Sequence, residues 1–229
     1  YAHDSSGITI AHNLLVGNAD CGVMLRTISE RVFHGTLVHT SHTRVLNNLI
    51  WNNSRPAISL PWPGPRADDN LSDYNVLCGT RDVWLGFEPW PGLFGVNLYK
   101  STDVKADALY GILKETLAKA GVPDTELPQE KAWRRYPTLT LAQWRLLMKQ
   151  DLHSAEDPQL ITVAVRSDVP MLTIRGKGAA LAMSCPAVEG VDRDYLGRPL
   201  QPGSIRPGPF QDLGAEDREV LLWPLPGGP

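Results

Sequence analysis

The chain has 229 residues, of which 42% are hydrophobic and 21% charged, and its formal net charge is −3. This composition is ordinary for a folded protein, and the length suffices for one domain with a full core. A nucleic-acid surface would be basic, and no apolar run approaches the ~20 residues that span a membrane. We therefore expect neither nucleic acid nor a membrane as a partner.

The residues from Gly7 to Leu25 recur along the chain. A shift of 35 positions places Asn13–Asn18 on Asn48–Asn53 without a gap, and a weaker third copy lies at Asp73–Gly79, 27 positions after the second. Each copy has short aliphatic and β-branched runs broken by Asn and Gly, which indicates strand, turn and strand. Because one unit cannot bury its apolar face alone, we expect the copies to stack with equivalent residues about 4.8 Å apart.

Asn13, Asn48 and Asn75 occupy equivalent positions of the three copies, each at a turn. Asn tolerates the left-handed backbone conformation, and an inward amide can bond the backbone of neighbouring units. We expect the three side chains to lie above one another in a structural role.

The segments GITIAHNLLVGN, RVLNNLIWNN and SDYNVL resemble the right-handed parallel β-helix of pectate-lyase-like and polygalacturonase-like carbohydrate enzymes. Sugar-active β-helix proteins of bacteria often close with S-P-A, D-x-x-G-x-x-R and D-I-G-A-x-E segments. Similar residues here are Ser184–Ala187, Asp194–Leu200 and Asp212–Glu216, although Cys185 interrupts the first, Leu200 replaces the Arg of the second, and Glu216 comes one position early in the third. The resemblance covers roughly residues 1–80 and 140–217.

This resemblance implies an all-β fold, a right-handed parallel β-helix (solenoid) with a short helical insertion and an irregular C-terminal segment. It also implies a polysaccharide or oligosaccharide substrate and a secreted or periplasmic location. We expect one β-helix domain over residues 1–229, with coils in 1–86, a helical excursion in 87–150, returning strands in 151–217 and a tail in 218–229.

Two helices are predicted within the excursion. The first spans Asp103–Ala120, with Thr102 as its N-cap, and the second spans Leu141–Lys149, where Thr140 and Gln143 form a capping-box pattern. We expect both to pack on one side of the stacked coils. Three further strands are predicted at Leu160–Val165, Met171–Ile174 and Ala179–Met183.

The N-terminal end of such a stack would expose apolar core and unpaired strand edges. Nothing before Gly7 can cover that end. We expect that N-terminal coils absent from this chain, or self-association, cover it.

Glycoside hydrolysis requires two carboxyl groups, about 5–5.5 Å apart in retaining enzymes and about 6.5–9.5 Å apart in inverting ones. Acids on adjacent units would lie about 4.8 Å apart, close to the retaining distance. We predict Asp4, before the first strand, and Glu30, after the first unit, as the catalytic carboxylates. Asp20 is an alternative, but it aligns with Arg55 in a turn, which favours a solvated residue.

Four further residues are predicted to line the substrate groove. Arg26, His34 and His39 can bind sugar hydroxyls or a carboxylate, and the guanidinium fork of Arg suits the carboxylate. Trp62, which lies between prolines, is the predicted platform for a sugar ring. The clustered histidines lack the spacing of a metal motif, so we predict no metal and, for a hydrolase, no cofactor.

A polysaccharide lyase that acts by β-elimination on uronate glycans is the alternative enzyme. It needs a strong base and a group that neutralises the uronate carboxylate, often Ca²⁺. Because no Lys precedes Lys100, Arg26 or His34 would be the base, and Asp68 and Asp69 would hold the cation. A non-catalytic glycan-binding β-helix is the third interpretation.

Overall fold

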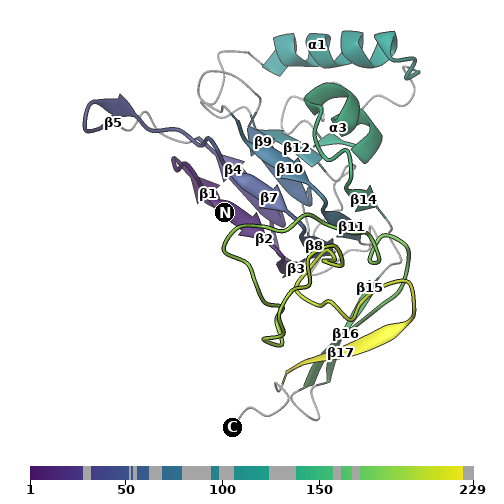
Figure 1. Ribbon diagram of the computed structural model, residues 1–229. Coiled ribbons are helices and arrows are strands. Elements are labelled where there is room, and N and C mark those ends of the chain that lie inside the picture. The colour runs from purple at the N-terminus through teal and green to yellow at the C-terminus, as the bar shows by residue number, and fades with distance from the viewer. Residues whose placement is uncertain are drawn as a thin grey trace.

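The computed structural model describes residues 1–27, 32–51, 53, 56–61, 69–78, 94–97, 106–123, 138–156, 161–166 and 171–223. Within these residues the protein is mostly β, with two helices and three sheets built mainly from parallel strands (Figure 1). None of the described helices has the length and apolar character needed to cross a membrane.

The three sheets take their strands from the chain in rotation, so that each unit contributes one strand to each sheet. The first sheet has the strand order β1 (Ala2–His3), β4 (Val23–Arg26), β9 (Ile58–Pro61), β12 (Phe94–Asn97) and β13 (Thr138–Leu139). The second sheet has the order β2 (Thr9–Ala11), β7 (Arg44–Leu46) and β10 (Leu71–Asp73). The third sheet has the order β3 (Leu14–Val16), β8 (Leu49–Trp51), β11 (Val76–Cys78) and β14 (Ala155–Glu156). Apart from the antiparallel β12–β13 pair, all these strands pair in parallel.

Strand partners in the first two units lie at the offset found by sequence comparison. Leu14 pairs with Leu49 and Val23 with Ile58, 35 positions apart. Leu49 in turn pairs with Val76, 27 positions further on. The aligned residues are therefore neighbours in parallel strands.

The equivalent asparagines stack as predicted. Asn13 Nδ2 donates to Asn48 Oδ1 over 3.1 Å, and Asn48 Nδ2 donates to Asn75 Oδ1 over 3.0 Å. Asn48 Nδ2 also donates to the backbone oxygen of Ile10 in the preceding unit, over 2.9 Å. The structural role expected for these residues is confirmed, because their side-chain amides bond one another from unit to unit.

Alternating side chains of the strands build two separate cores. Ile50 and Leu77 belong to the core enclosed by the three sheets, whereas Leu49 and Val76 belong to a second core on the other face of the third sheet. Successive strand residues point to opposite faces, so both faces of the third sheet are buried. This explains the unbroken apolar run from Leu49 to Trp51, which is typical of a doubly covered parallel strand.

Both helices lie at the end of the stack beyond β12, rather than along one side of it (Figure 1). α1 (Ala106–Lys119) and α3 (Leu141–Met148) contribute Leu113 and Trp144 to the enclosed core, where both are at most 1% exposed. The predicted capping box of α3 is present: Thr140 Oγ1 accepts from Gln143 N, and Gln143 Oε1 accepts from Thr140 N. The N-cap predicted at Thr102 lies outside the described residues.

The excursion also contains a strand that was not predicted. We expect a helical excursion in residues 87–150, but β12 pairs in parallel with β9, with Phe94 opposite Ile58. Its four residues are too few to show an alternating pattern, and only pairing with β9 identifies them as a strand.

The C-terminal sheet is antiparallel and comprises β15 (Ile161–Arg166), β16 (Met171–Gly176) and β17 (Arg218–Trp223). Two of the predicted strands are confirmed as β15 and β16. The strand predicted at Ala179–Met183 is wrong: these residues form turns in which Ala182 N donates to Ala179 O, and Leu181 is the only one of them that is fully buried. Residues 218–223, placed in the tail, form β17 because Val220 and Leu222 pack against the outer face of the third sheet.

Ion pairs join two of the closing segments that carry the family resemblance. Arg198 Nε donates to the buried Asp194 Oδ2 over 2.7 Å, and Arg198 Nη1 donates to Asp212 Oδ2 over 2.8 Å. Asp194 Oδ1 also accepts from the backbone nitrogens of Leu196 and Arg198. These residues hold the irregular segment together, so their role in the fold is structural.

Candidate functional site

The first turn of the chain brings polar side chains together between the first and second sheets. β1 pairs with β4 so that His3 lies opposite Arg26, and Asp4 N donates to Arg26 O over 3.2 Å. Asp4 has a φ of 46°, a left-handed conformation that Asp tolerates and that redirects the chain here. The Asp4 side chain is 1% exposed, and its Oδ2 lies 3.5 Å from His3 Nδ1.

The chain returns to this turn one unit later. Thr40 Oγ1 donates over 2.7 Å to the same Arg26 oxygen that Asp4 N contacts. Ser41 N donates to Ser5 O over 3.3 Å, so the backbone around His39 runs beside that of Asp4. We call the residues that these backbone contacts gather at the turn the polar corner: His3, Asp4, Ser5, Arg26 and His39.

Three atoms of the polar corner are buried without a hydrogen-bond partner in the described part of the structure: His3 Nδ1, Ser5 Oγ and His39 Nδ1. Nearly all buried polar atoms in folded proteins are bonded, because leaving one unpaired costs about 1–3 kcal/mol. Such atoms on three neighbouring residues of the polar corner indicate a place for water or a polar ligand.

An exposed aromatic ring borders the polar corner. Tyr1 is 65% exposed, and its ring centroid lies 5.3 Å from that of His3. Tyr combines an apolar ring face with a polar hydroxyl, which suits a ligand that has both apolar and hydroxyl groups. The predicted platform is Trp62, and Tyr1 was not predicted. The available signal was its spacing, because residues two apart in an extended chain lie on the same side, as Tyr1 and His3 do.

Three of the six predicted site residues meet in the polar corner: Asp4, Arg26 and His39. His34 does not join them, because β5 (Val32–Phe33) and β6 (Thr36–Leu37) form a hairpin that projects away from the sheets, with His34 in its turn (Figure 1). The structure thus places His34 apart from the polar corner, and its role in substrate binding stays a prediction. Glu30 and Trp62 lie outside the described residues, so their roles stay predictions.

Asp20 and Asp69, two further acids considered from the sequence, have local partners. Asp20 is exposed and its Oδ1 accepts from Cys21 N over 2.9 Å, as in a solvated turn. Asp69 Oδ2 lies 2.8 Å from Arg44 Nη2, and the hydrogen bond and charge of Arg44 lower the pKa of that carboxyl. In the described part of the chain, no group of three or more His, Cys, Asp or Glu side chains is arranged to hold a metal.

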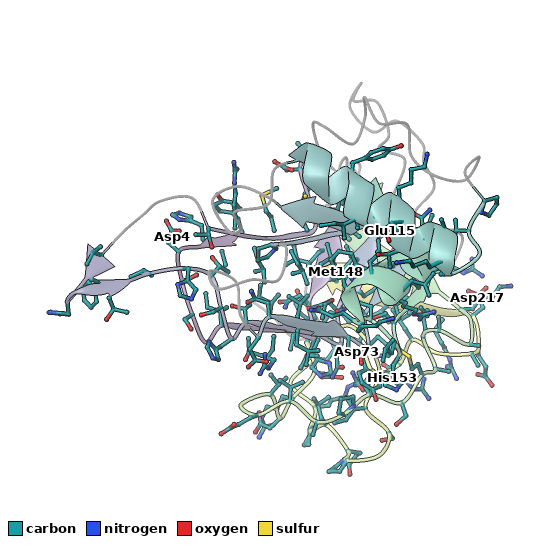
Figure 2. All side chains as sticks on the ribbon, turned by 90° about the horizontal axis from the view of Figure 1, so that it is seen from above. Asp4, Asp73, Glu115, Met148, His153 and Asp217 are labelled. Carbon is teal, nitrogen blue, oxygen red and sulfur yellow. The ribbon has the colours of Figure 1, made fainter. Side chains whose placement is uncertain are left out.

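A second titratable pair was not predicted from the sequence. His153 Nδ1 lies 2.8 Å from Asp73 Oδ2, and the imidazole stacks on Tyr74 with ring centroids 4.5 Å apart. His153 N also donates to Asp73 Oδ1 over 2.8 Å. The pair lies well apart from Asp4 (Figure 2). Its two members are 80 positions apart, so no local pattern could reveal it, and its backbone bond ties the segment before β14 to β10.

Comparisons with known proteins define no family for this chain. No protein-family profile and no curated protein matches it. A solved structure described as the complex of XylC with xylose is similar at 13% identity and a TM-score of 0.29, over 95% of this chain and 43% of that chain. The chain thus spans less than half of that protein, and a likeness this low carries no argument about either fold or activity.

Proposed function

We propose that the stacked units form part of a right-handed parallel β-helix of a carbohydrate-active protein, and that the polar corner binds sugar. The rotation of strands through three sheets and the stacked asparagines support the fold. The observation that carries the function is that His3 Nδ1, Ser5 Oγ and His39 Nδ1, three buried atoms of the polar corner, have no hydrogen-bond partner in the described part of the structure. A secreted or periplasmic location accompanies this proposal.

A sugar fits the polar corner because each hydroxyl both donates and accepts hydrogen bonds. The imidazole nitrogens of His3 and His39 and the hydroxyl of Ser5 can each take either role, depending on tautomer and rotor. Arg26 supplies further donors, and the exposed Tyr1 ring offers an apolar face for the ring carbons. The three unpaired atoms would then gain the partners that they lack in the described structure.

For the reaction we propose glycoside hydrolysis in which Asp4 is one of two carboxyl groups and Glu30 the other. The imidazole of His3, 3.5 Å from the Asp4 carboxyl, is placed to orient that carboxyl. The separation of the two carboxyl groups would decide between retention and inversion of the anomeric configuration.

The test is release of reducing sugar from a panel of neutral and uronate glycans, with ultraviolet absorbance followed in parallel. Hydrolysis gives reducing ends without new absorbance, and Asp4→Asn and Glu30→Gln should each lower the rate by about 100-fold or more. Asp20→Asn is the matched control, because Asp20 is an exposed turn residue and its loss should leave the rate unchanged. Release with new absorbance would identify a lyase and refute the carboxylate assignment.

Glycan binding without hydrolysis is the second candidate function. It is favoured by the 1% exposure of the Asp4 side chain, since a catalytic carboxyl must reach the scissile bond. Titration of oligosaccharides with detection by NMR separates the two. Binding that is lost in Tyr1→Ala and His39→Ala, but kept in Asp4→Asn without any turnover in the parent chain, would establish a binding protein.

A further inference from the structure

The two ends of the stack are finished differently. Beside β10, Gln150 Oε1 accepts from Ser72 N over 2.9 Å and Gln150 Nε2 donates to Asn70 O over 2.8 Å. One side chain thus makes the hydrogen bonds that a further strand would make. In the third sheet β14 pairs with β11, and Ser154 Oγ accepts from Asn75 N over 2.8 Å. This end of the stack is closed.

At the opposite end, the first sheet extends one strand further than the other two. Ala2 of β1 pairs with Leu25 of β4, and β4 belongs to the same unit as β2 and β3. β1 therefore occupies the first-sheet position of a preceding unit. In the described part of the chain no strand occupies the matching positions beside the outer edges of β2 and β3.

The peptide groups of those outer edges can be identified from the next unit. Arg44 N donates to Ile8 O, and Leu49 N donates to Asn13 O, so both residues face the first unit. Their equivalents 35 positions earlier are Thr9 and Leu14, whose peptide groups point in the same direction and therefore away from the second unit, since the strands are in parallel register. The same argument applies to Ala11 and Val16, whose equivalents Leu46 and Trp51 accept from the first unit.

The asparagine stack also changes at this end. Asn48 and Asn75 each donate from Nδ2 to a backbone oxygen of the preceding unit, Ile10 O and Val45 O. Asn13 instead donates to Ala11 O of its own unit, over 2.9 Å. Its side chain thus makes a local bond where the other two bridge adjacent units.

Apolar burial shows the same step. Leu25, Val45 and Ile50 are fully buried, whereas their pairing partners at this end of the stack are only partly buried: Ala2, Ile10 and Leu15. An added unit would cover the last two and remove apolar surface from water.

A cleft of about 690 Å³ adjoins this end, between Ala11–Leu14 and the C-terminal segment that includes Tyr195 and Phe210. One unit further along, the corresponding corner residue Asn47 contacts the same C-terminal part: its Nδ2 donates to Pro186 O, and its backbone oxygen accepts from Gly208 N. The cleft therefore lies where the corner of an added unit would meet the C-terminal segment.

We propose that this end of the stack is a docking surface for a polypeptide segment that adds one parallel strand to β2 and one to β3. The segment carries the pattern of Ile8–Val16: two alternating apolar residues, a corner residue, an Asn above Asn13, and three aliphatic residues. The proposal rests on the parallel stack and is independent of the sugar site. A second copy of the chain is the competing occupant. It fits less well, because a two-fold dimer would pair the edge strands antiparallel and could not continue the asparagine stack.

The register specifies the test. Ala2 pairs with Leu25, so Tyr1 occupies the position equivalent to Met24. A second copy of residues Ile8–Val23 fused directly before Tyr1 therefore continues the register. Its strands would lie beside β2 and β3. Amide hydrogen exchange at Thr9, Ala11, Leu14 and Val16 should slow by about tenfold or more relative to the parent chain. The matched control fusion carries Ile10→Asp and Leu15→Asp in the copy and should not slow exchange.

Ile10 and Leu15 of the original chain are internal controls, since their peptide groups already face β7 and β8. If these two stay protected while the four edge amides exchange as fast as in the parent, the proposal is overturned. Equal protection by the control fusion overturns it too. If the parent alone shows the four amides protected together with a dimeric mass by light scattering, a second copy is the occupant. Should the fusion not fold, a synthetic peptide of Ile8–Gly17 in excess over the parent gives the same readout.

Discussion

The indole Nε1 of Trp144 donates a 2.9 Å hydrogen bond to Oδ2 of Asp151, and both residues are fully buried. Oδ1 of the same carboxyl accepts from Ser72 Oγ, Asn75 Nδ2 and Ser154 Oγ, at 3.0, 3.3 and 2.5 Å. One carboxyl group thus links α3 to the last strands of the second and third sheets. Burial raises the pKa of Asp151, and the hydrogen bonds from Ser154, Ser72, Asn75 and Trp144 act against that rise.

Asp151→Asn should lower the free energy of unfolding by about 1–3 kcal/mol, because the amide keeps one acceptor oxygen and leaves a buried donor unpaired. Urea denaturation measures the change. Asp217→Asn is the control: Asp217 pairs with Arg175 at the surface, where an ion pair contributes at most about 1 kcal/mol.

The same variant tests the titration of Asp151. A carboxyl whose pKa is raised in the folded state adds stability below its unfolded pKa of about 3.9, and this is lost as the pH rises through the folded pKa. Asp151→Asn lacks this contribution. The difference in unfolding free energy between the parent and the variant should therefore be largest at low pH and shrink as the pH rises. A deficit that is constant from low to neutral pH would contradict the raised pKa of Asp151.

The asparagine stack predicts unequal costs for equivalent substitutions. Asn48 is fully buried and bonds Asn13, Ile10 and Asn75, so Asn48→Ala should lower the free energy of unfolding by about 2–3 kcal/mol. Asn13 is exposed at the end of the stack, and Asn13→Ala should cost less than about 1 kcal/mol. Thermal and urea unfolding of both variants check the ranking, and equal losses would show that the stack does not act through buried hydrogen bonds.

His12 predicts a loss of stability on mild acidification. Its Nδ1 lies 3.2 Å from Gly208 O, and its Nε2 lies 3.0 Å from Nδ2 of Asn47, so a neutral ring donates to the first and accepts from the second. Burial lowers the pKa of His12, and the bond to Gly208 partly opposes this. The neutral form is therefore favoured in the folded state, and stability is lost as the pH falls below the unfolded pKa of about 6.5.

His12→Asn should remove about 1 kcal/mol of the fall in unfolding free energy between pH 7 and pH 5. Asn suits the left-handed backbone at this position, where φ is 54°, and Asn47 already occupies the equivalent position in the next unit. His42→Asn is the control, because His42 has a similar φ of 51° but is exposed. A parent and a His12→Asn variant with identical pH profiles would refute the assignment.

Two glycines should respond in opposite ways to Ala. At Gly22 an added Cβ would lie 2.5 Å from Ile50 Cγ2 and 2.7 Å from Ala57 O, so Gly22→Ala should lower the free energy of unfolding by about 1–3 kcal/mol. At Gly111, inside α1, nothing lies within 4 Å, and Gly111→Ala should raise it by about 0.5–1 kcal/mol. Urea denaturation of both variants checks the signs.

Local patterns determined the repeated part of this protein. The 35-residue offset between Asn13 and Asn48 is also the offset between paired strand residues. A shift of one residue would turn every side chain to the other face of its sheet, so the apolar pattern fixes the register. The asparagine stack followed from the same offset, because equivalent residues of adjacent units lie beside one another. The α3 capping box depends only on Thr140 and Gln143, three positions apart.

Tertiary contacts decided the rest. β12 is a strand only because β9 lies beside it, and β17 forms because Leu49 and Val76 offer an apolar outer face. The hairpin that carries His34 away and the return of His39 to Asp4 depend on where the chain goes between units. So does the Asp73–His153 pair, 80 positions apart. The packing of whole sheets brings such distant side chains into contact. The periodicity of a short segment does not predict that packing.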